Sequence, residues 1–185
     1  AMREASSVCS YGSWIKIDSK GVELDKFDMP YHHGLVFESL LKNYVVNFQT
    51  LMIKKSLLID NNLNFDSNLK FSTDHNLVLR IAYYWPILSI NSFLSKYRVH
   101  EGSMSSNRKT DKMNDFDYTI DFLQKLGAQK KCNNFKYISS KARLRMLLLD
   151  SVDDKNYKHF LQVVFQYLFL ITRAFLNKSN INSDF

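Results

Sequence analysis

The stretch "FSTDHNLVLRIAYYW", residues 71–85, decides the fold, because it predicts a helix that begins beside a carboxylate. Its apolar residues recur at helical spacing. A hydroxyl of Ser72 or Thr73 could cap the helix by accepting a free backbone N–H of the first turn. Asp74 lies in that turn, where the helix dipole favours negative charge. Taken alone, Asp74 need be no more than a helix-start residue.

A second polar group follows in "LSKYRVHEGSMSS", residues 94–106. Alternate side chains of a strand point to one face, so we expect Lys96, Arg98 and His100 to share a face. Such a cationic row suits a diphosphate leaving group, because negative charge builds up there as the bond to it breaks. The alternative is an exposed strand face that carries a lone histidine.

The surrounding pattern predicts a mixed α/β fold. We expect strands at 8–17, 48–55, 86–90 and 94–100, with a tight turn between the last two, and helices at 33–46, 56–60 and 74–84. The helix at 56–60 opens with a serine that could cap it. From about residue 109 to 176 the pattern is helical. We therefore place a boundary near residue 105, between a domain at 1–105 and a helical extension at 106–185.

Composition indicates a folded chain that needs no disulfide. Hydrophobic residues make up 45% of the 185 residues, and only two prolines and five glycines occur, which argues against a disordered or linker-rich chain. Cys9 and Cys132 are far apart and fit no metal-binding spacing. We therefore expect free thiols in a reducing compartment, and we recognise no secretory signal.

The positive charge is concentrated in the last third of the chain. Residues 122–180 contain eleven Lys or Arg and three Asp, a balance of +8, whereas the whole chain carries +7. A patch of this kind favours an anionic partner, such as acidic lipid, nucleic acid or a phosphorylated ligand. The alternative is a solvated helical face rich in lysine.

Several short motifs occur in a characteristic order along residues 6–106. They are the "VCSYGSWIKIDSKG" segment, Lys54-Lys55, Asn64-Phe65-Asp66, Thr73-Asp74, Leu77-Val78-Leu79-Arg80, and Tyr97-Arg98-Val99-His100 followed by Ser103 and Ser105. In order and spacing, these motifs resemble the second half of a family 2 glycosyltransferase of the GT-A fold. The resemblance implies that residues 1–105 form the acceptor-side half of such a domain.

The resemblance also implies roles for individual residues. Asp74 corresponds to the general base, which removes a proton from the acceptor hydroxyl as that oxygen displaces the nucleotide from the donor sugar with inversion. His100 corresponds to a ligand of the divalent metal, Mg or Mn, that bridges the donor diphosphate. Lys96 and Arg98 would bind that diphosphate. Thr73 stands where the family often has glutamate, so any acceptor contact made by that glutamate is not predicted here.

The family's nucleotide-binding half, with its Asp-x-Asp metal motif, has no equivalent before Val8. The Asp-x-Asp at Asp115-Phe116-Asp117 follows the site region, and on a helix its two carboxylates would diverge, so we do not assign it to metal. We therefore expect the nucleotide-binding half to lie outside this chain and the chain alone to be inactive.

Residues 156–176 are apolar almost all round, but their uninterrupted apolar runs are too short to span a bilayer. Such a helix must pack against other helices, a homodimer partner or a membrane surface. The resemblance thus implies a cytoplasmic sugar transferase of glycan or polysaccharide synthesis at the inner face of the membrane, which uses a nucleotide-sugar donor and a hydroxyl acceptor that can be lipid-linked. The alternative function is a non-catalytic module whose basic helices bind anionic lipid or nucleic acid.

Overall fold

The computed structural model of the protein describes residues 7–28, 33–100, 109–132, 134–153, 161–166 and 168–169. The chain divides into two compact units, residues 1–126 and 127–185, and each is described here by itself. The serine-rich segment that we expect to contain the boundary near residue 105 lies outside the described residues.

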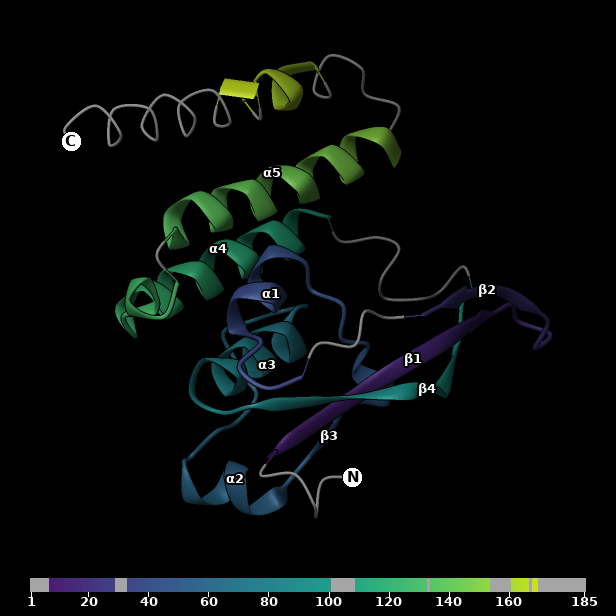
Figure 1. Ribbon diagram of the computed structural model, residues 1–185. Helices are drawn as coiled ribbons and strands as arrows, with labels where there is room; N and C mark the ends of the chain where they lie inside the picture. The colour runs from purple at the N-terminus through teal and green to yellow at the C-terminus, as the bar shows by residue number, and fades with distance from the viewer. Residues whose placement is uncertain are drawn as a thin grey trace, which may run out of the picture. The chain divides into compact units, whose positions relative to one another are not determined.

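The first unit contains a four-stranded mixed sheet built around β1, Cys9–Ile17 (Figure 1). β1 pairs antiparallel with β2, Glu23–Phe27, and with β3, Met52–Ile53, and it pairs in parallel with β4, Ile87–Arg98. β3 pairs with the start of β1, and β2 with its end. Together with the helices, this sheet confirms the mixed α/β class.

β4 is one continuous strand, so the prediction of two strands at 86–90 and 94–100 joined by a tight turn is wrong. The pairing register between β4 and β1 shifts on either side of Ser13. Residues 91 and 92, where we predict the turn, therefore interrupt the regular pairing without ending the strand. Gly12 permits the close approach of the two strands there. A Cβ at this position would lie 2.6 Å from Leu94 Cδ1 and 3.0 Å from the backbone oxygen of Ser92.

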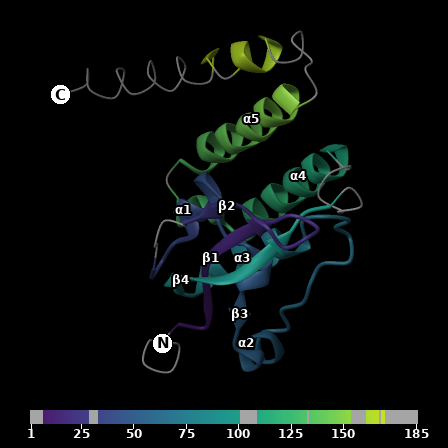
Figure 2. The same cartoon turned by 90° about the vertical axis from the view of Figure 1, so that its right-hand side faces the viewer.

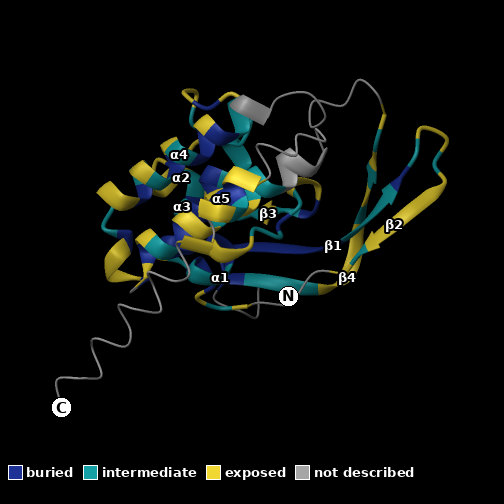
Figure 3. Cartoon of the chain, turned by 90° about the horizontal axis from the view of Figure 1, so that it is seen from above, coloured by how far each residue is buried: buried dark blue, intermediate teal, exposed yellow. Residues whose placement is uncertain are grey.

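The far end of the sheet is held by aromatic packing. The Trp14 ring stacks on Phe27 of β2 with ring centroids 3.9 Å apart, and it meets the edge of Tyr97 of β4 at 5.5 Å. β1 is buried over its first half, whereas β2 is exposed (Figure 3). The end of the sheet near β2 therefore depends on these ring contacts more than on the core.

Helices surround the start of β1. α1 runs over Phe37–Lys42, shorter than the predicted 33–46, and buries Phe37, Leu40 and Leu41. α3, Thr73–Tyr84, buries both pairs of apolar residues at helical spacing, Leu77 with Ile81 and Val78 with Ala82. α3 thus fills the core of the first unit, as the periodicity of residues 71–85 predicts.

The predicted strand at 48–55 is wrong over most of its length. Phe48–Thr50 forms a turn of 3₁₀ helix, η1, because the Asn47 side chain accepts the N–H of Gln49 at 2.9 Å. Only the two residues of β3 are extended. α2, Lys55–Asp60, then begins one residue earlier than predicted, and Ser56 does not cap it, since Lys54 occupies the N-cap position. Figure 2 shows α2 beyond β3.

α4, Lys109–Lys125, belongs to the first unit, which therefore extends past the boundary that we expect near residue 105. The Asn76 side chain of α3 donates to Thr119 Oγ1 at 3.2 Å, and the Tyr83 hydroxyl donates to the carbonyl of Leu126 at 3.0 Å. These bonds join α3 to α4 and to the residue that directly follows it.

The second unit is helical where it is described. η3, Ala128–Lys130, follows Gly127, whose φ of +84° suits glycine. α5, Phe135–Asp153, comes next, and residues 161–166 and 168–169 are also helical. Cys9 and Cys132 form no disulfide, as the sequence predicts, and both are buried.

Candidate functional site

The start of α3 is fixed by a carboxylate from α4. Asp115 is buried and accepts backbone N–H groups of Lys70 at 3.2 Å, Phe71 at 2.6 Å and Ser72 at 2.7 Å. Ser72 occupies the N-cap position, but its side chain makes no capping bond, so the predicted hydroxyl cap is wrong. Asp115 thus has a structural role, in agreement with our decision not to assign it to metal.

Asp74 lies in the first turn of α3 and is half-buried. Burial raises the pKa of its carboxyl group above the usual 3.8, although the backbone N–H groups of Asp74 and His75 act to lower it. Burial therefore outweighs the stabilisation that a helix start gives to a negative charge. A carboxylate with a raised pKa is better suited to accept a proton near neutral pH.

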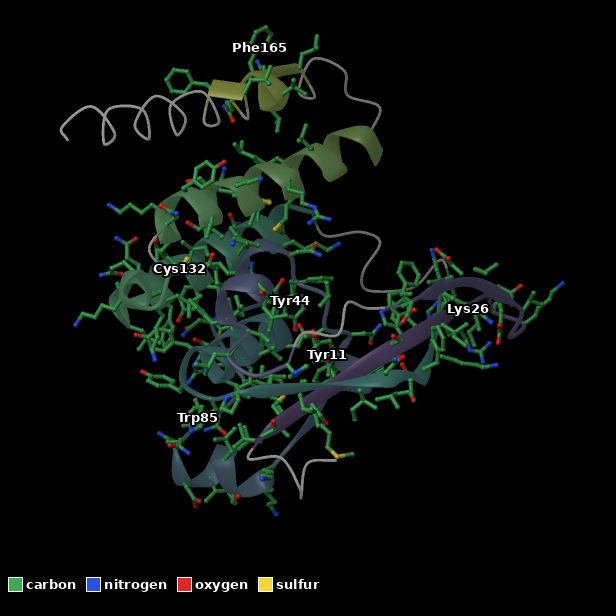
Figure 4. All side chains as sticks on the ribbon, viewed as in Figure 1. Tyr11, Lys26, Tyr44, Trp85, Cys132 and Phe165 are labelled. Carbon is green, nitrogen blue, oxygen red and sulfur yellow. The ribbon has the colours of Figure 1, made fainter. Side chains whose placement is uncertain are left out.

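Tyr44, which follows α1, lies beside this carboxylate. Burial, and then the charge of Asp74, raise the pKa of Tyr44 well above its usual value, so the phenol stays protonated. The Tyr44 hydroxyl is buried and has no hydrogen-bond partner among the described residues. A buried hydroxyl without a partner costs stability, which makes it a candidate for a functional contact. Figure 4 shows Tyr44 among the helices of the first unit.

His75 completes the group with a neutral imidazole. Its ring meets the edge of Tyr44 with centroids 4.5 Å apart and stacks near Phe116 of α4 at 6.1 Å. Burial lowers the pKa of His75 to about 4, so the ring carries no charge at neutral pH. A charged His75 would stabilise the Asp74 carboxylate, and the neutral ring does not.

Lys96 and Arg98 make contacts with the β1–β2 hairpin. Lys96 Nζ lies 3.2 Å from Glu23 Oε1. Arg98 Nη1 donates to the carbonyls of Asp18 at 3.0 Å and Ser19 at 2.9 Å. Both side chains are engaged with this hairpin, which favours a structural role for them over diphosphate binding.

The structure does not bring these cations to Asp74. Arg98 pairs with Ile17 at the end of β1, and His100 follows two residues later. At the start of β1, the Cys9 thiol and the Asp74 carboxylate both act on the pKa of Tyr44. Nine extended residues span about 26 Å. The predicted site residues therefore fall into two groups, one near each end of β1.

The described residues do not fit a metal site by themselves. No group of three or more His, Cys, Asp or Glu side chains in the described part of the chain could hold an ion. His100 could supply at most one ligand. A divalent metal would need its other ligands from elsewhere.

The loop before α3 is held by residues whose importance the sequence reading missed. Asp66 Oδ2 accepts the Tyr118 hydroxyl of α4 at 2.9 Å. Arg80 Nη1 donates to the carbonyl of Asn64 at 3.1 Å, and its guanidinium lies 5.2 Å from the centre of the Phe122 ring.

A signal for this face of α4 was present in the sequence. Three residues follow Asp115 at helical spacing, namely Tyr118 after three residues, Thr119 after four and Phe122 after seven, which places all four on one side of a helix.

No protein-family model matches the sequence, and no curated protein matches it significantly.

Proposed function

We propose that the first unit is the acceptor-side half of an inverting glycosyltransferase of the GT-A type, with Asp74 as the general base. One observation carries the proposal. The Asp74 carboxyl group is half-buried at the start of a rigid helix, and burial raises its pKa. Rigidity and a raised pKa are the two properties that a catalytic carboxylate base needs.

The reaction is a single displacement. Asp74 accepts the proton of an acceptor hydroxyl while that oxygen forms a bond to the anomeric carbon of the donor sugar. The bond from this carbon to the nucleoside diphosphate breaks, and the leaving group departs with the bonding electrons. Attack from the side opposite to the leaving group inverts the configuration at the anomeric carbon.

The neighbours of Asp74 support this role. Asp115 holds the start of α3 in place through three backbone N–H groups. The protonated hydroxyl of Tyr44 still has its hydrogen to donate, and an acceptor oxygen or the Asp74 carboxylate could accept it. Neutral His75 leaves the negative charge of Asp74 uncompensated. Asp115 thus helps to fix the position of the carboxylate, and neutral His75 adds no positive charge that would lower its pKa.

The donor would bind to a nucleotide-binding half that the described residues do not contain. Mg or Mn would bind mainly to that half, and no step above depends on the metal. Lys96 and Arg98 would reach a diphosphate only after they leave their contacts with the β1–β2 hairpin. Cys9 and Cys132 are buried and form no disulfide, which supports a reducing, cytoplasmic location.

The test uses the full-length protein that contains this sequence. We expect Asp74→Asn to lower acceptor-dependent nucleotide release by roughly 10²–10⁴-fold, because an amide cannot take up the proton. Donor affinity should not change. Asp66→Asn is the matched control, since Asp66 is an exposed carboxylate of the preceding loop that binds Tyr118. Equal rates for the two variants would contradict the proposal.

A further inference from the structure

The helical residues near the C-terminal end of the second unit expose a row of large apolar side chains. Leu161, Phe165, Leu168 and Phe169 are 55%, 72%, 53% and 68% exposed. At about 100° per residue, their spacing places all four within an arc of about 100° on the helix surface. Val163, on another side of the same helix, is buried at 2% exposure. We call the described helical residues 161–166 and 168–169 the apolar helix.

The second unit that carries this helix is strongly basic. In sequence, residues 127–185 contain ten Lys or Arg and four Asp, a balance of +6. Lys130, Lys136 and Lys141 are exposed in the described part of the unit. The unit that carries the apolar helix therefore attracts an anionic partner, and its charge disfavours association with a second copy of the same unit.

A phosphate-bearing partner alone does not account for the apolar side chains. Nucleic acid would satisfy the lysines through its phosphates, but a phosphate backbone buries no row of Leu and Phe. A bilayer with anionic headgroups satisfies both features, because its surface attracts lysine and its acyl boundary takes up apolar side chains.

We propose that the apolar helix docks on the surface of an anionic membrane, with Leu161, Phe165 and Leu168 inserted at the acyl boundary. Figure 4 shows Phe165 on the side of its helix that faces away from α5, where a flat surface could reach it. No helix in the described residues is long and apolar enough to cross a bilayer. Because Val163 on another side of this helix is buried, the proposal places the helix in the plane of the interface, with only its apolar row inserted.

The test is co-sedimentation of the full chain with vesicles of phosphatidylcholine alone or with 30% phosphatidylglycerol. We expect binding to the anionic vesicles at low salt, weaker binding at high salt, and little binding to the neutral vesicles. The double variant Leu161→Gln with Phe165→Gln should bind the anionic vesicles about ten-fold or more weakly, since two apolar side chains no longer insert. Glutamine keeps good helix propensity.

The matched control is Val22→Gln with Leu35→Gln, two residues of the first unit that are 58% and 78% exposed. This control should bind the vesicles like the wild type. If the helix variant loses helicity by circular dichroism, Lys136→Gln with Lys141→Gln provides a second test, and it should also weaken anionic binding and flatten its salt dependence.

Three results would overturn the proposal. The helix variant could bind anionic vesicles as tightly as the wild type. The wild type could sediment with neither kind of vesicle while forming a dimer that the helix variant dissociates. It could also bind a duplex DNA in preference to the anionic vesicles, with neither affinity changed by the helix variant.

Discussion

Asp74 experiences two opposing influences at the start of α3. The helix dipole and two backbone N–H groups favour its charged form, whereas burial disfavours it, and burial has the larger effect on the pKa. The Asp74 carboxylate in the folded protein therefore takes up a proton more readily than an aspartate in water. Charged groups that cost stability in this way are common at functional sites, where they favour reactivity.

The raised pKa predicts how stability depends on pH. Because protonation of Asp74 is easier in the folded state, its favourable contribution is complete below the unfolded pKa near 3.8 and is lost as the pH rises through the raised folded pKa. Asp74→Asn removes this loss. We expect the variant to melt at a higher temperature than the wild type at pH 7 and at the same temperature near pH 3.

Thermal unfolding at the two pH values checks this expectation by calorimetry. A residue that served only to begin the helix would behave in the opposite way, since its loss would cost about 0.3–1 kcal/mol at pH 7. A lower melting temperature for Asp74→Asn at neutral pH would therefore contradict the account of this carboxylate.

Replacement of Asp115 tests how far its side chain stabilises the start of α3. Asp115→Ala leaves three backbone N–H groups before α3 without their acceptor. We expect a loss of about 2–3 kcal/mol in the free energy of unfolding, measured by urea denaturation. Asp121→Ala is the control, because Asp121 is exposed on the same helix. Equal losses for the two variants would mean that Asp115 does not hold the start of α3.

At the scale of elements, the irregular pairing of β1 and β4 depends on the absence of a side chain at Gly12. We expect Gly12→Ala to cost about 1–3 kcal/mol in chemical denaturation, because the new methyl group would collide with Leu94. Gly12→Ala with Leu94→Ala should regain most of this loss, since Leu94 is 44% exposed and its truncation alone should cost little. If the double variant is as unstable as Gly12→Ala alone, contact with Leu94 is not the reason why position 12 requires glycine.

The elements that the sequence predicted well are those whose signal is local. α3 followed from its apolar periodicity, and β1 lies within the strand predicted at 8–17. β4 was predicted wrongly because Asn91 and Ser92 resemble a turn, whereas the strand continues through them, with Ile90 paired to Gly12 and Phe93 paired to Ser13 on either side. The strand at 48–55 failed because the Asn47 side chain stabilises η1 locally.

At the scale of the whole molecule, the candidate site could be predicted only in part. The position of Asp74 at a helix start was evident, but its burial depends on segments far away in sequence. Tyr44 reaches it from the chain after α1, and Asp115 is 43 residues beyond Ser72. The hydrogen bond from the Arg98 side chain to the β1–β2 hairpin could not be predicted either, because alternation along one strand does not show which segment packs beside it.

The acid limb of the pH–rate profile tests the central claim, that Asp74 is a half-buried general base, most directly. The measurement is kcat/KM for acceptor-dependent nucleotide release by the full-length protein, which reports the pKa of the essential base in the free enzyme. We predict that the wild-type rate falls as the pH drops through a pKa above 3.8, and that the residual activity of Asp74→Asn shows no such limb. An Asp74→Asn variant with near wild-type turnover and the same acid limb would contradict the account.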